Sequence, residues 1–197
     1  MSKLDEAFNA FDNYNQQDPQ VFTWEGHTYP QEYFFALKLH DWVKVLDPQA
    51  SEELLLASRS QHIGRWEIPR SSYPEGREGY LKWRKDLGQY HADKAAGIMQ
   101  QSGYSEEQAA RVKQIIQKQK LKVDKEVQTI ENALCLVFLQ YQYPEFLHQH
   151  EPEKVINILR KSLLKMDAHG HQYALKLNYS ELGLHYVNEA VKLIQGD

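Results

Sequence analysis

The sequence reads SEELLLASRSQHIGRWEIPR from residue 51 to residue 70. A serine N-cap, two acidic residues and a leucine-rich run predict a helix, and a proline near the end of the stretch cannot continue it. Counting back from Trp66, His62 and Leu55 recur at helical spacing, so we expect these three residues on one helix face. Several arginines surround this histidine in the sequence, and the pattern indicates a site for an anionic ligand.

Helix starts and stops divide the rest of the chain in the same way. Pro30 is a good first helical residue for a helix that Asp47-Pro48 ends, and Ser105 with Gln108 forms a capping-box pattern. We find no convincing strand pair; the residues from 21 to 29 are expected to form an irregular link with a short extended piece. The remaining helices are expected over residues 80–103, from 124 past 138, over 152–168 with Gly170 as the stop, and over 180–194. The pattern predicts an all-α protein.

Size and composition restrict the class of protein. The chain has 197 residues, 42% of them hydrophobic and 25% charged, which is ordinary for a globular protein of one domain. We expect an N-terminal extension over residues 1–28 that packs on a domain over residues 29–197. The net charge of −4 argues against a general nucleic-acid binder. A lone Cys135, an N-terminus without an apolar stretch and the lack of a membrane-length segment favour a cytoplasmic protein with no membrane partner. The sequence leaves the oligomeric state open.

Three polar residues lie on otherwise apolar helical faces: His62, His91 and Glu131. Burial without a partner would cost each about 1–3 kcal/mol, so we expect them to meet one another, a metal or a ligand. They are the candidate catalytic residues, and the two histidines are the candidate ligands if a metal is present. Arginine holds phosphate well through bidentate contacts. The candidate ligand-binding residues are Gln61, Arg65, Trp66, Arg70, Arg84 and Lys118.

Each of these features also has a purely structural interpretation. A histidine on an apolar face can be a core residue bonded to a backbone carbonyl, and this alternative stays open for His62 and His91. Glu131 can be the buried salt-bridge partner of Lys118 or Arg65, which we favour. The arginines can pair with nearby surface carboxylates, and Trp66 can pack in the core.

The order of the helices and their end residues resemble the HD-domain metal-dependent phosphohydrolase family. The run from Leu54 to Arg65 is similar to the family's Leu-Leu-Ala run leading into His-Asp-Ile-Gly-Lys, and His91 matches the next family histidine. Segments 112–118 and 129–134 resemble two further family motifs. The resemblance places the family's other metal ligands at Phe35, Gln61-His62, Lys118 and Leu134. It therefore implies an HD-like helical bundle in which the usual two-metal site is not expected, and where Lys118 supplies positive charge.

A second resemblance covers nearly the whole chain. The strings at residues 46–51, 61–70 and 80–84, and those at 126–132, 135–139 and 159–162, are similar to the domain-of-unknown-function family 4202. Asn132 stands where that family more often has Asp. This resemblance implies a fold and carries no activity.

Two functions follow as expectations. The first is a divergent HD-like hydrolase for a phosphorylated small molecule or nucleotide, in which His62 and His91 orient or activate water, directly or through a divalent metal. In that mechanism Arg65, Arg70 and Lys118 neutralise the phosphate, and Glu131 positions them. The second is a non-catalytic module on the same fold that binds a nucleotide-like anion. A third, structural interpretation predicts that His62→Ala mainly lowers stability.

Overall fold

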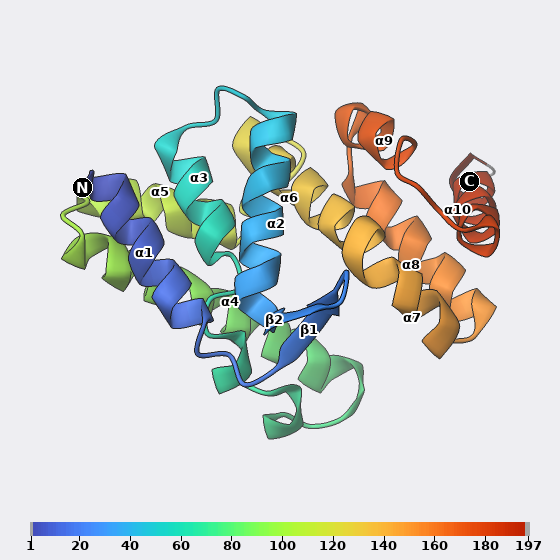
Figure 1. Ribbon diagram of the computed structural model, residues 1–197, viewed down its shortest axis with the longest axis horizontal. Coiled ribbons are helices and arrows are strands. Elements are labelled where there is room, and N and C mark those ends of the chain that lie inside the picture. The colour runs from blue at the N-terminus through green and yellow to red at the C-terminus, as the bar shows by residue number, and fades with distance from the viewer. Residues whose placement is uncertain (1, 196–197) are drawn as a thin grey trace. The chain divides into compact units, whose positions relative to one another are not determined.

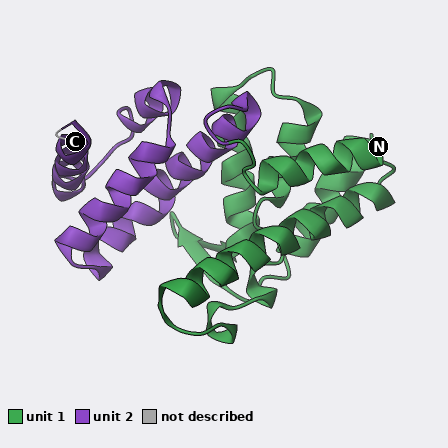
Figure 2. Ribbon diagram, turned by 180° about the vertical axis from the view of Figure 1, so that it is seen from behind, with its two compact units in different colours: residues 1–120 green, residues 121–197 purple. Residues whose placement is uncertain are grey.

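Helices dominate the fold. In a computed structural model, which describes residues 2–195, the chain forms ten α-helices, three short helical turns and one sheet of two strands (Figure 1). The predicted all-α class is confirmed. The chain divides into two compact units, residues 1–120 and residues 121–197, shown in separate colours in Figure 2. This division lies elsewhere than the boundary expected after residue 28, and an extension over residues 1–28 with a domain over 29–197 stays a prediction.

The first unit is a helical cluster with one β-hairpin. Helix α3 packs against α1, α2 and α5, and α4 packs against α5. Leu54, Leu56 and Ile115 are fully buried in this core. The elements of the unit are α1 (Lys3–Asn15), β1 (Val21–Trp24), β2 (His27–Pro30), α2 (Gln31–Leu46), α3 (Glu52–Ser60), the turns η1 (Arg65–Glu67) and η2 (Arg70–Ser72), α4 (Gly76–Gln101) and α5 (Glu106–Ile116).

The second unit is built on α8. This helix packs against α10, α6 and α7, and α6 also packs against α9. Ile130, Leu136 and Leu159 are fully buried. The elements are α6 (Lys125–Val137), the π-helical turn η3 (Phe138–Gln142), α7 (Tyr143–Gln149), α8 (Pro152–Lys165), α9 (Ala168–Ala174) and α10 (Glu181–Gln195).

The hairpin corrects the expectation of no strand pair. Strands β1 and β2 are antiparallel, with Val21 opposite Pro30 and Trp24 opposite His27. The two residues between the strands, Glu25 and Gly26, both have positive φ, at 49° and 80°. A two-residue loop with positive φ at both positions matches the twist of a hairpin. The sequence does not predict this turn, because asparagine, aspartate or glycine is typical of the position that Glu25 occupies.

Several helix ends lie where the sequence predicts them. The Ser51 side chain caps α3, Ser105 and Gln108 form the capping box of α5, and Asp124 caps α6. The expected stop at Gly170 is wrong. Helix α8 already ends at Lys165, and Gly170 lies inside α9, where its N–H donates to the capping side chain of Asp167 at 2.9 Å.

The main correction concerns the helix that was expected to reach Trp66. Helix α3 ends at Ser60, residues 61–64 form a turn, and Gly64 has a left-handed φ of 67°. A left-handed residue breaks the helical path, and glycine takes this conformation without a steric cost. His62 and Trp66 therefore do not share one helix face.

Gly64→Ala is expected to lower the free energy of unfolding by about 1–3 kcal/mol, because an L-residue is strained at this φ. A β-carbon there would also lie 3.0 Å from Cε1 of Tyr90. Urea unfolding followed by circular dichroism measures the change. The matched control is Gly88→Ala inside α4, where a β-carbon would meet nothing within 4 Å. We expect that helical site to gain about 0.5–1 kcal/mol. Equal effects at the two glycines would contradict the strain argument.

Candidate functional site

One face of α4 holds the segment from residue 61 to residue 70 in place. Nδ1 of His91 lies 2.7 Å from the carbonyl oxygen of Ile63, and Nε1 of Trp83 donates to the carbonyl oxygen of Ile68 at 2.9 Å. Trp83 and His91 are eight residues apart, so they lie on nearly the same side of the helix. The path of the segment after α3 is therefore set by side chains of α4.

This arrangement brings the two predicted histidines together. The rings of His62 and His91 have their centroids 5.7 Å apart. His91 is buried, whereas 35% of the His62 side chain is exposed. Helix α4 supplies His91 and the turn after α3 supplies His62. The two imidazoles thus form a pair of which one member faces solvent.

Glu32 is the carboxylate of this site, and sequence reasoning missed it. One carboxylate oxygen of Glu32 lies 3.8 Å from Nδ1 of His62, and the other lies 3.7 Å from Nε of Arg65. Glu32 is 5% exposed and belongs to the first turn of α2. A signal was present: Glu32 precedes Phe35 by three residues and Leu39 by seven, so an acid occupies the apolar face of this helix.

The protonation states follow from burial and from neighbouring charges. Burial raises the pKa of Glu32 to about 7, although Arg65 counteracts this effect. Burial lowers the pKa of His91 to about 4. Loss of hydration, followed by the positive charge of Arg65, holds the pKa of His62 well below its usual range, and Lys118 and Arg84 act in the same direction. Both histidines are therefore neutral at pH 7.

Three predicted ligand-binding residues supply the charge around the histidines. Arg65 lies with its guanidinium 5.3 Å from the ring centroid of Trp83, and 38% of its side chain is exposed. Arg84 is exposed on α4, seven residues or about two helical turns before His91. Its guanidinium donates to the hydroxyl of Tyr80 at 3.2 Å. Lys118 follows α5 with a left-handed φ of 55°.

The other predicted residues of the segment make structural contacts. Gln61 is buried and donates to the carbonyl oxygen of Ile116 at 2.9 Å. The guanidinium of Arg70 donates to the carbonyl oxygens of Tyr73 at 2.9 Å and Pro74 at 2.8 Å, and so closes the loop before α4. These contacts anchor the segment at both ends.

Trp66 stacks on Tyr14 of α1, with ring centroids 5.8 Å apart. Beside this stack, the carboxylate of Glu67 accepts hydrogen bonds from the hydroxyls of Tyr14 and Tyr90. The ammonium of Lys94 lies 3.8 Å from the Glu67 carboxylate. The aromatic ring of Trp66 thus helps to attach the segment to α1.

Glu131, the third predicted catalytic residue, belongs to the second unit. It is 2% exposed, and its carboxylate lies 3.6 Å from the ammonium of Lys165. The sequence favours a salt bridge of Glu131 with Lys118 or Arg65, and this pairing stays a prediction. Within the second unit, the ion-pair partner of Glu131 is Lys165. Within the first unit, Glu32 is the carboxylate that pairs with His62 and Arg65.

The donor set does not fit a metal ion. Among residues 2–195, no three or more His, Cys, Asp and Glu side chains are grouped so that they could hold one. The histidines His62 and His91, the candidate ligands from the sequence, are accompanied by three cationic side chains, which would repel a divalent cation.

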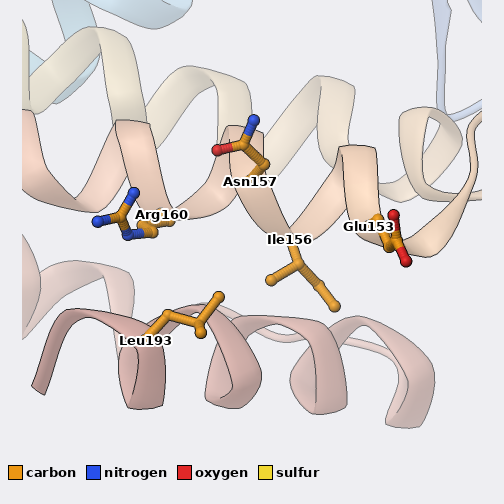
Figure 3. Close-up of a pocket in the computed structure, with 5 residues that line it drawn as sticks. All are labelled: Glu153, Ile156, Asn157, Arg160 and Leu193. Atoms are coloured by element: carbon orange, nitrogen blue, oxygen red, sulfur yellow. The ribbon is translucent and has the colours of Figure 1, made fainter. Parts of the chain in front are cut away.

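A shallow pocket lies elsewhere, in the second unit. It has a volume of about 350 Å³ and lies between α8 and α10 (Figure 3). Ile156 of α8 and Leu193 of α10 point toward each other across it, whereas Arg160 and Glu153 lie at its two ends. None of the residues that the sequence singles out lines this pocket.

These features define a class: a mostly α-helical protein in which two neutral histidines and a buried glutamate stand among cationic side chains. The chain belongs to the family described as Domain of unknown function (DUF4202), whose model matches residues 5–187. No curated protein and no solved structure matches the chain. Across residues 2–195, no helix is both long enough and apolar enough to cross a membrane.

The low pKa of His91 makes stability depend on pH. The unfolded chain takes up a proton on this residue below pH 6.5, whereas the folded chain does so only below about pH 4. The contribution of His91 to the free energy of unfolding is therefore complete above pH 6.5 and falls as the pH is lowered. We expect His91 alone to account for a loss of about 2 kcal/mol between pH 7 and pH 5. Denaturant unfolding of the wild type and of His91→Asn at both pH values isolates this contribution, and parallel pH profiles would contradict it.

The effect of Glu32 on the pH dependence of stability has the opposite sign to that of His91. Its folded pKa of about 7 lies above the unfolded value of 4.5, so its contribution to stability is present at low pH and is lost as the pH rises through 7. Glu32→Gln keeps the shape and removes the charge. We expect this variant to gain about 2–3 kcal/mol of stability relative to wild type on going from pH 5 to pH 8. A difference between the two proteins that does not change with pH would show that Glu32 titrates normally.

Proposed function

We propose that the group of residues around His62 binds a small molecule that carries a phosphate. The observation that supports this most directly is the concentration of positive charge: Arg65, Lys118 and Arg84 all act on the His62 ring. Against them stands Glu32, whose carboxyl is about half protonated at pH 7. The site therefore carries an excess of positive charge although the whole chain has a net charge of −4.

Phosphate suits this arrangement better than a carboxylate does. A guanidinium donates two parallel hydrogen bonds to phosphate oxygens, and a phosphate dianion gains more from several nearby cations than a single negative charge does. The exposed parts of Arg65 and His62 give such a ligand access from solvent.

Binding of an anion would also change His62. The cations around the ring oppose its protonation, and a bound dianion would offset their charge. The pKa of His62 then rises toward its usual value, so that the imidazole becomes able to accept a proton and donate it to a phosphate oxygen. We therefore expect phosphate binding near pH 6 to be accompanied by proton uptake.

The geometry of Glu32 favours hydrolysis as a second candidate. The carboxylate of Glu32 lies 3.8 Å from Nδ1 of His62, which is longer than a hydrogen bond but close enough to stabilise the imidazolium formed when the ring accepts a proton. His62 would then accept a proton from water, the hydroxide would attack phosphorus, and the bond to the leaving oxygen would break as that oxygen takes up a proton. This candidate is consistent with the HD-like resemblance and needs bound substrate to restore the basicity of His62.

Removal of the cations tests the binding proposal. We expect Arg65→Gln and Arg84→Gln each to weaken binding of inorganic phosphate about 5- to 20-fold, since one charge-assisted hydrogen bond contributes about 1–2 kcal/mol. Isothermal titration at constant ionic strength measures the affinity. The matched control is Arg77→Gln, an exposed arginine at the start of α4. The proposal fails if phosphate does not bind the wild type, or if Arg77→Gln weakens it as much as the other two variants do.

Hydrolysis is tested with the same proteins. Release of inorganic phosphate from p-nitrophenyl phosphate and from nucleoside monophosphates is compared for the wild type, His62→Gln and Arg77→Gln. Turnover that disappears in His62→Gln and persists in Arg77→Gln supports the catalytic candidate. Phosphate binding without turnover in the wild type would leave the binding function and remove hydrolysis of these esters.

A further inference from the structure

The hydrogen bond of His91 fixes which of its nitrogens carries the proton. Nδ1 lies 2.7 Å from the carbonyl oxygen of Ile63. A carbonyl oxygen can only accept, so Nδ1 must donate its proton. Because the ring is neutral at pH 7, Nε2 has no proton and presents a lone pair. Nε2 of His91 is thus a hydrogen-bond acceptor.

This acceptor is buried and lacks a donor. Among the residues that the structure describes, nothing donates a hydrogen bond to Nε2 of His91. Gln61 repeats the pattern: its amide nitrogen donates to Ile116, and its buried side-chain oxygen has no donor either. Each such acceptor costs about 1–3 kcal/mol when it has no partner, and the described residues hold others, on Asn15 and Gln128. The acceptor of His91 differs from those two because its ring lies beside His62 in the candidate site. The acceptors of His91 and Gln61, one in the site and one next to His62 in the chain, call for a partner that brings hydrogen-bond donors.

The phosphate group of a monoester does not suit that role, because its dianion, the main form at neutral pH, has no proton to donate. A metal ion would accept the lone pair of Nε2, but the positive charges of Arg65 and Arg84 act at the position of the His91 ring and would repel a cation there. A hydroxyl group meets both conditions, since it donates a hydrogen bond and carries no charge.

We propose that the ligand is a phosphate ester of a hydroxylated molecule, such as a sugar phosphate, and that one of its hydroxyl groups donates to Nε2 of His91. This inference rests on the proposed phosphate site and specifies its ligand. Arg65 and Arg84 act electrostatically on both histidine rings, so phosphate and hydroxyl belong close together on the ligand.

Access to Nε2 requires a side chain to move, because that atom has almost no contact with solvent. His62 is the neighbour placed to do so: its ring centroid is 5.7 Å away and its side chain is a third exposed. Rotation of His62 toward the bound phosphate would uncover Nε2 and give the imidazole a second anionic partner besides Glu32.

The test compares matched ligands by isothermal titration on the full chain. The probes are ribose 5-phosphate and glycerol 3-phosphate, which carry hydroxyl groups, and propyl phosphate, which has none. We expect at least one hydroxylated ester to bind about tenfold more tightly than propyl phosphate, the effect of one good hydrogen bond to a buried acceptor. In His91→Asn, whose amide nitrogen can still donate to Ile63, this preference should disappear, so that the variant binds the three esters with equal affinity.

The outcomes separate the two proposals. Equal binding of all three esters by the wild type would overturn the hydroxyl assignment and leave the phosphate site intact. Absence of binding for every ester and for inorganic phosphate would overturn both. A preference that survives in His91→Asn would place the hydroxyl on another residue and also overturn the assignment.

A measurement on the wild type keeps the test independent of whether the variant folds. Long-range proton–nitrogen NMR spectra distinguish a protonated ring nitrogen from one with a free lone pair. We expect His91 to show a protonated Nδ1 and an unprotonated Nε2, and the Nε2 resonance to move upfield when a hydroxylated ester binds. A protonated Nε2 in the free protein, or a resonance that does not move at saturation, would contradict the proposal.

Discussion

The hydrogen bond between His91 and the carbonyl oxygen of Ile63 is the constraint on which the site depends. It ties the turn after α3 to the middle of α4, and the bond from Trp83 to Ile68 fixes the same segment one step further along. Together with the stack of Trp66 on Tyr14, these two bonds fix the path of the residues after Gly64. The same bond fixes the tautomer of His91. One contact therefore sets both the local fold and the role of Nε2 as a hydrogen-bond acceptor.

The helical class and most helix ends were predictable because capping chemistry is local. A serine or aspartate side chain that accepts from the first turn acts within three residues, and such signals can be read without tertiary structure. The turn at residues 61–64 was not predictable in this way. His62 and Trp66 fit a helical period, but the left-handed Gly64 and the packing against α4 override it, and periodicity carries no information about a partner helix.

The candidate site was predicted in part. His62, His91 and Arg65 meet because their segments pack on α4 and α2, and the predicted Glu131 lies on α6, in the second unit. Glu32 has the same sequence signature and was overlooked because it stands in the first turn of a helix, where acidic residues commonly interact with the helix dipole. The distinction between these roles needs the neighbours of the side chain, which spacing alone does not give.

The passage from α5 to α6 has a further consequence. Lys118, Lys120 and Lys122 all have left-handed backbone conformations, with φ of 55°, 61° and 73°. Non-glycine residues in this conformation cost about 1 kcal/mol or more each, so the passage is wound at an energetic cost. Lys122 recovers part of that cost by donating to the carbonyl oxygen of Met166 at 2.8 Å. The number of residues in this connection is therefore constrained. An insertion or deletion would move the left-handed conformation to other residues, and it would also displace Lys122 from the carbonyl oxygen of Met166.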